Sequence, residues 1–326
     1  MKLFKPRYYD DFRCIAGACP DSCCQEWAVV VDADKADFYR GLPGELGNRL
    51  RSVLAEEDGE TVMVIENRRC PMWRADGLCR IQAELGEQAL CKTCREFPRL
   101  THDYGDFMEL QLELSCPVAA QLILAGDDSP VVVEQPGGEA EYDGDAMETL
   151  LRSRGEALRY LHDVSVPVNE ALAQLLFYAY AVQEELDGGE RAVFAPVDLR
   201  AYYGKGNSGA LLEFFAGLEL LTDRWRDRLA TPEDGPWTEA HRALVRYFVQ
   251  RYWLQAVADY DLVSRAKLAV ISCLAIKLLG GDTAATAQLY SKEIENDAEN
   301  VDALLDGAYT AAALTDANLL ALLLRS

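Results

Sequence analysis

Histidine is scarce in this chain of 326 residues, which contains only His102, His162 and His241. No two of them have the spacing of a metal-binding pair, so the sequence does not indicate a histidine-based metal centre. A G-x-G-x-x-G that follows a strand and the phosphate-binding G-x-x-x-x-G-K-[ST] are both missing, which disfavours the common nucleotide folds. A C-x3-C-x2-C triplet is absent too, which excludes an ordinary radical S-adenosylmethionine loop.

Long apolar runs and excess positive charge are also lacking. No apolar run approaches the roughly 20 residues of a membrane helix, and the first residues, MKLFKPRYYDDFRC, lack the apolar stretch of a secretory signal. We therefore expect a cytoplasmic protein that does not bind a membrane. The net charge of −22 disfavours nucleic acid as a partner, because phosphates require a basic face. This acidity indicates either a well-solvated surface or electrostatic steering of a basic partner.

Cysteine is abundant and concentrated near the start of the chain. In a reducing compartment, clustered thiols bind metal more often than they form disulfides, and thiolate suits both zinc and iron–sulfur clusters. Nine thiols can supply one four-thiolate site with several to spare, or two sites with one to spare. A structural module stapled by zinc is a further interpretation of the cluster. Cys273 lies in an apolar run and is expected to be a core residue. The nine are Cys14, Cys19, Cys23, Cys24, Cys70, Cys79, Cys91, Cys94 and Cys116.

The pattern of apolar residues predicts a mainly α fold. Residues 1–126 are expected to form a cysteine-rich metal-binding module with short strands, residues 127–145 a linker, and residues 146–326 an all-helical domain. Within the first part we expect strands in 26–34 and 61–67 and short helices in 33–42 and 79–90.

Two details of the helical part can be predicted. Asn169 is expected to be the N-cap of the helix that ends near Gly188. The apolar stretch 239–281 is long enough for two helices, with a break near 259–261.

The cysteine motifs, taken in order, resemble those of the flagellin lysine-N-methylase (FliB-type) family. They are CC-x2-W at 23–27, CP-x7-C-x-I at 70–81, LGE-x2-LC-x-TC at 85–94, FPR at 97–99 and LSCPVAA at 114–120. A looser group of cysteine-rich zinc- or iron-chelating proteins shares part of this pattern. The alternative function is therefore a non-catalytic chelating module with a helical docking domain.

The resemblance implies S-adenosylmethionine as methyl donor, a cysteine-bound [4Fe–4S] cluster and a lysine amine of flagellin as acceptor. The implied metal ligands are the nine cysteines, with Cys91 the weaker member, and zinc is the alternative metal. The motif does not decide which four hold the cluster. The family usually has an acidic residue after SCP, whereas this chain has Val118.

Further candidates adjoin the cysteine motifs. A lysine amine must be neutral to accept a methyl group, and a carboxylate can take up its proton. The candidates for this base are Glu26, Glu87 and Glu96, each of which could equally be a surface carboxylate. Arg95 and Arg99 are candidates for binding the carboxylate of S-adenosylmethionine or for structural ion pairs. Trp27 is expected to pack over the metal site or to contact the cofactor. The sequence indicates no oligomeric state.

Overall fold

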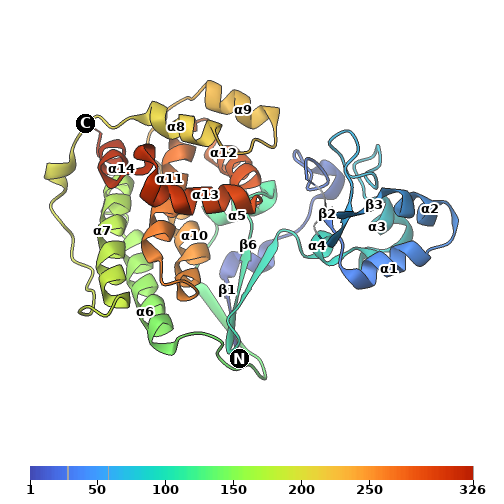
Figure 1. The fold of residues 1–326 in the computed structure, drawn as a ribbon, viewed down its shortest axis with the longest axis horizontal. Coiled ribbons are helices and arrows are strands. Elements are labelled where there is room, and N and C mark those ends of the chain that lie inside the picture. Colours follow the sequence, from blue (N-terminus) through green and yellow to red (C-terminus); the bar gives the residue numbers. More distant parts are fainter. Residues whose placement is uncertain (28, 58, 326) are drawn as a thin grey trace.

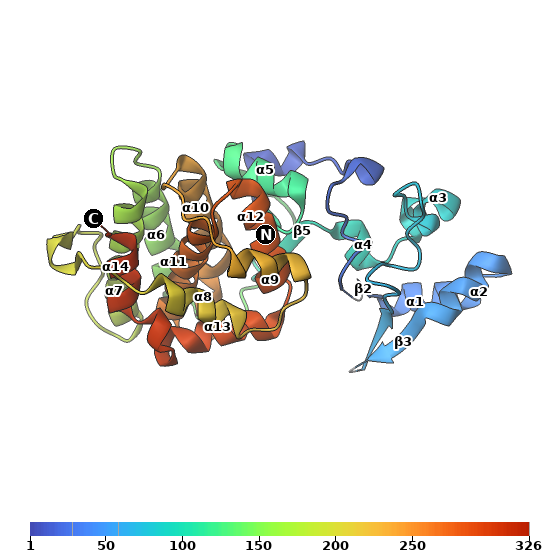
Figure 2. The same ribbon diagram turned by 90° about the horizontal axis from the view of Figure 1, so that it is seen from above.

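The computed structural model describes residues 1–27, 29–57 and 59–325. The chain forms two lobes, which lie side by side in Figures 1 and 2. The small lobe runs from β2 to α4, residues 29–96, and the large lobe holds the remaining helices and strands. The strands are β1 Lys2–Pro6, β2 Val29–Val30, β3 Leu54–Glu57, β4 Glu60–Met63, β5 Arg99–Asp103, β6 Phe107–Leu112 and β7 Pro130–Glu134.

Fourteen α-helices dominate the described residues, which confirms the mainly α prediction. They are α1 Ala33–Gly41, α2 Gly44–Val53, α3 Arg80–Leu85, α4 Lys92–Glu96, α5 Pro117–Ala125, α6 Gly144–Leu161, α7 Val168–Leu186, α8 Ser208–Ala216, α9 Asp223–Ala230, α10 Glu239–Tyr252, α11 Leu262–Leu279, α12 Thr283–Tyr290, α13 Ala298–Thr310 and α14 Asp316–Leu323. None of the helices in the described ranges is long and apolar enough to cross a membrane.

The small lobe has its own hydrophobic core. Its three strands pair in the order β2-β4-β3, all antiparallel, and α1 and α2 pack against each other beside them. The buried side chains all belong to residues 29–91 and include Tyr39, Leu50 and Met72. The two predicted strands are present but shorter than expected, as β2 and β4. A lobe this small buries little apolar surface.

The large lobe contains a four-stranded sheet in the order β5-β6-β1-β7. The strands β1 and β6 are parallel, with Leu3 opposite Met108, and the other pairs are antiparallel. The sequence did not predict this sheet, and the stretch expected to be a linker contributes its edge strand, β7. The sheet is tied to the helices by the ion pair between Glu109 of β6 and Arg154 of α6, in which Nη1 donates to Oε2 over 2.8 Å.

From residue 144 onward the described chain forms helices and no strands, as predicted. The central helix is α11, whose side chains are buried all round except at Lys277. Such a helix must be enclosed by others, and α7, α10 and α13 pack against it. The predicted break near 259–261 is confirmed, since α10 ends at Tyr252 and α11 starts at Leu262. The prediction for Asn169 is wrong, because Pro167 takes the N-cap position of α7.

Candidate functional site

All nine early cysteines line one cavity of about 340 Å³ between the two lobes. Apolar side chains from both sides complete the wall: Phe12, Phe97 and Pro117 from the large-lobe side, and Tyr39, Met63, Met72 and Ile81 from the small lobe. The four cysteine groups, which are spread over more than a hundred positions, thus meet in space. Their role as metal ligands stays a prediction.

Three of these thiols stand at the starts of helices. Cys79 is the N-cap of α3, Cys91 that of α4 and Cys116 that of α5. Burial raises the pKa of Cys79 and of Cys116, and hydrogen bonds from backbone N–H groups in the first helical turn partly oppose this rise. The N–H groups of a helix start favour negative charge, so these positions stabilise a thiolate once a metal displaces the proton.

The pKa values of two pairs of neighbouring thiols depend on each other. The pKa of Cys24 is lowered because the thiol of Cys23 donates a hydrogen bond to it, and the pKa of Cys91 is lowered by the thiol of Cys94 in the same way. In each pair the donor is held protonated, so the pKa of Cys23 and of Cys94 is raised. Metal binding at this cavity must therefore release protons.

The donor atoms fit zinc or an iron–sulfur cluster, since both prefer sulfur. Among the described residues, no three His, Cys, Asp or Glu side chains already stand in the arrangement of a metal site. The thiols therefore surround the cavity without having converged on one point.

Of the three candidate bases, only Glu87 lines the thiol cavity. Its side chain is exposed at the rim. Glu26 points into a different pocket, where its carboxylate accepts a hydrogen bond of 2.7 Å from Nε of Arg68. Glu96 lies outside the cavity lining, and its closest ion pair is with Arg95 at 3.9 Å.

The two candidate arginines and Trp27 do line the cavity. The guanidinium of Arg99 lies over the ring of Phe12, 5.1 Å from its centre, which positions it by cation–π contact. The ring of Trp27 lies 6.1 Å from that of Phe97 at the cavity wall. Val118 is only partly exposed and packs against the large-lobe core, outside the cavity lining.

Three residues that position the first cysteine loop have no signal in the sequence. The carboxylate of Asp21 accepts hydrogen bonds of 2.9 Å from Nε2 of Gln288 and from Nζ of Lys292. Lys292 belongs to a π-helical segment, Ser291–Glu295, that directly follows α12. Asp21 itself lines the thiol cavity, so the C-terminal helices hold the loop of residues 14–24 in place.

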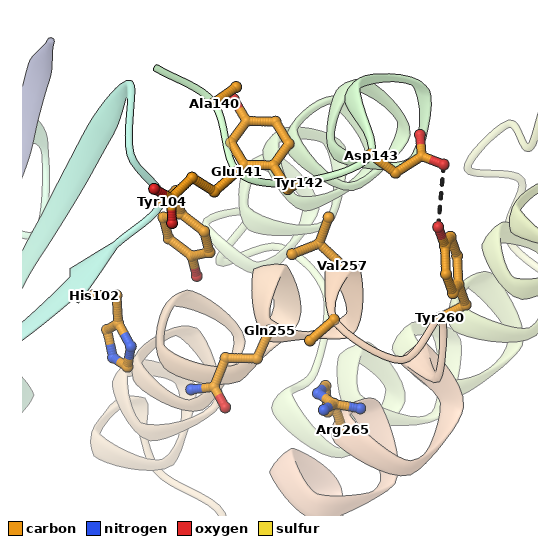
Figure 3. Close-up of a pocket in the computed structure, with 11 residues that line it drawn as sticks. His102, Tyr104, Ala140, Glu141, Tyr142, Asp143, Gln255, Val257, Tyr260 and Arg265 are labelled. Carbon is orange, nitrogen blue, oxygen red and sulfur yellow. Dashed lines mark hydrogen bonds between the residues drawn. The ribbon is translucent and has the colours of Figure 1, made fainter. Parts of the chain in front are cut away.

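A further pocket of about 810 Å³ lies at the other end of β5 and contains no cysteine. Figure 3 shows Tyr104, Tyr142 and Arg265 around it, with the hydroxyl of Tyr260 donating to Asp143 over 3.1 Å. The prediction that His102 has no metal role is untested, but its ring lines this pocket and not the thiol cavity.

Part of the chain is similar in sequence to proteins of Salmonella. A stretch of 142 residues, 41% of this chain, is 29% identical to the flagellar biosynthetic protein FliU of Salmonella muenchen and covers 84% of that protein. The chain is also 29% identical over 142 residues to the lysine-N-methylases of Salmonella choleraesuis and Salmonella typhimurium. The matched stretch covers 35% of the length of each of these proteins. No family model matches the chain. No solved structure matches it either. Part of the chain is thus similar in sequence to proteins named lysine-N-methylase, of which it spans about a third of the length.

Proposed function

We propose that the protein transfers a methyl group from S-adenosylmethionine to lysine side chains of flagellin, and that the cavity thiols hold a [4Fe–4S] cluster. One observation carries the proposal. Several motifs of this chain resemble the methylase family, and the cysteines of all of them line a single cavity. The names of the related proteins support lysine methylation in general terms.

The chain's own residues suit an amine acceptor. A lysine amine is protonated at neutral pH, with an ordinary pKa of about 10.4, and must lose its proton before its nitrogen can attack a methyl carbon. Bound S-adenosylmethionine supplies that methyl on a positively charged sulfur. The carboxylate of Glu87, at the rim of the cavity, takes the proton, and the apolar wall favours the neutral amine by excluding water. The guanidinium groups of Arg95 and Arg99 bind a carboxylate of the donor.

The test is mass spectrometry of flagellin from the same source after incubation with anaerobically prepared protein and S-adenosylmethionine. We expect mass increments of single methyl groups on lysines. Glu87→Gln is expected to lower the turnover number about 100-fold, the usual contribution of a general base. Glu96→Gln is the matched control, because Glu96 adjoins a cysteine motif but lies outside the cavity lining. Unmodified flagellin in the presence of fully metal-loaded protein would overturn the proposal.

The alternative function is a non-catalytic zinc- or iron-chelating module, which the many thiols in the cavity wall favour. The identity of the bound metal distinguishes this function from the methylase. An iron–sulfur enzyme is brown, absorbs broadly in the visible range and is sensitive to oxygen. A structural zinc module is colourless, because zinc has a filled d shell. Metal analysis of anaerobically purified protein distinguishes the two independently of any methylation assay.

A further inference from the structure

We infer that the nine cavity cysteines form two separate sulfur centres, with the boundary between them at the adjacent pair Cys23 and Cys24. The inference rests on the proposed function only in taking the thiols to be metal ligands. The first centre consists of Cys14, Cys19, Cys23 and Cys116, and the second consists of Cys24, Cys70, Cys79, Cys91 and Cys94.

Four of the nine thiols are placed by two different hydrophobic cores. Cys116 is buried in the core of the large lobe, at the start of α5. Cys91 is buried in the core of the small lobe, and Cys70 and Cys79 pack against that same core. A packed core fixes the side chains within it, so these groups are held by different rigid bodies.

Backbone contacts join the second set into one scaffold. The N–H of Cys70 donates to the carbonyl of Cys24 over 2.8 Å, which attaches Cys24 to the small lobe. Trp73, whose N–H donates to the carbonyl of Cys70, forms a β-bridge with Cys79. Cys91 and Cys94 lie one turn apart at the start of α4, as the C-x2-C spacing requires.

The first set is assembled by one glutamine. Nε2 of Gln288 donates both to the carboxylate of Asp21, in the loop that carries Cys19 and Cys23, and to the carbonyl of Ser115, each over 2.9 Å. Ser115 directly precedes Cys116 in the chain. The thiol of Cys19 donates to the carbonyl of Asp21 over 3.3 Å. The loop is therefore held beside Cys116 and on the large lobe.

The division has a direct consequence for metal content. Four thiolates complete one zinc ion or one iron–sulfur cluster, so the first set is complete with no spare and the second has one spare. Removing one ligand abolishes the first centre, whereas the second requires the removal of two. The matching variants are Cys116→Ser and the double variant Cys70→Ser/Cys79→Ser. The control is Cys273→Ala, because Cys273 is buried in α11 and lies outside the cavity lining.

The experiment measures iron and zinc per chain in full-length protein reconstituted anaerobically with ferrous iron and sulfide. Free thiols are then labelled with a maleimide and located by peptide mass spectrometry. We expect Cys116→Ser and Cys70→Ser/Cys79→Ser each to lose about half of the metal, and the triple variant nearly all. In Cys116→Ser, Cys14, Cys19 and Cys23 should become reactive while the second set stays protected. Cys273→Ala should match the wild type, and circular dichroism checks that each variant folds.

Three results would overturn the inference, two of them in the Cys116→Ser variant. One is a single substitution, Cys116→Ser, that releases all of the metal and exposes all the thiols together; the other is full metal content in that variant. Nine reactive thiols and no metal in the wild-type protein would refute it as well. Failure of flagellin methylation by protein with both centres filled would instead remove only the proposed activity.

Discussion

Replacing Asp21 by Asn should destabilise the protein strongly, because it leaves a buried ammonium group without its counter-charge. The side chain of Lys292 is only 3% exposed and that of Asp21 15%, with 2.9 Å between Nζ and Oδ1. Breaking a buried ion pair by neutralising one partner costs about 3–5 kcal/mol. Because Asp21 is partly exposed, we expect Asp21→Asn to destabilise the protein by about 3 kcal/mol. The pair of Arg68 with Asp223 joins the two lobes, but its side chains are 50% and 68% exposed. Asp223→Asn should therefore cost less than about 1 kcal/mol.

Equilibrium urea unfolding, followed by circular dichroism at neutral pH, measures these free energies of unfolding. In the double variant Asp21→Asn/Lys292→Met the buried charge is gone, so at least about 1 kcal/mol should be recovered relative to Asp21→Asn alone. If Asp21→Asn proves as stable as Asp223→Asn, or the double variant shows the summed cost of the two single changes, our account of this contact is wrong.

The large lobe allows three further predictions. Burial lowers the pKa of His241 to about 4, below an unfolded value of about 6.5, so folding stability should fall by about 3 kcal/mol as the pH drops from 6.5 to 4. His241→Gln should remove that part of the pH dependence in urea titrations, and an unchanged pH profile would contradict it. Glu295→Gln should cost about 3–5 kcal/mol in thermal unfolding, because Glu295 pairs with buried Arg251 at 3.2 Å; a cost below about 1 kcal/mol would count against it. Leu150→Ala should cost about 2–5 kcal/mol and Leu151→Ala under about 1, since these neighbours on α6 are 0% and 40% exposed; equal costs would refute the assigned burial.

The helices were predictable because their signal is local. A period of 3.6 residues follows from one helix facing one core, and it predicted both the helical part from residue 146 onward and the break before α11. The sheet was not predictable in this way. Its central strand β1 pairs in parallel with β6, about a hundred residues later, and no short-range pattern records that contact. Asn169 failed as an N-cap for the same reason, because its amide donates to the carbonyl of Leu323 at the far end of the chain.

The candidate site, too, was predictable only in part. Thiols are recognisable by residue type, so the sequence alone identified the nine that line the cavity. It could not identify which of the neighbouring carboxylates reaches the cavity, since Glu26, Glu87 and Glu96 have similar surroundings in sequence. The contact between Asp21 and Gln288 spans 267 positions, and neither residue type is unusual. Groups that hold a site in place carry a weaker signal than groups that perform its chemistry.

The contact between Arg99 and Phe12 has a consequence for how such a protein is put together. The segment that contains the loop of residues 14–24 and the small lobe starts after Phe12 and ends before Arg99, and these two residues touch, 5.1 Å from guanidinium to ring centre. The small lobe is therefore an insertion into a single surface position of its host, of the kind that folded domains tolerate because both ends lie together. The host sheet and helices have their own hydrophobic core, but they take the counter-charge of the buried Lys292 from Asp21 of this segment.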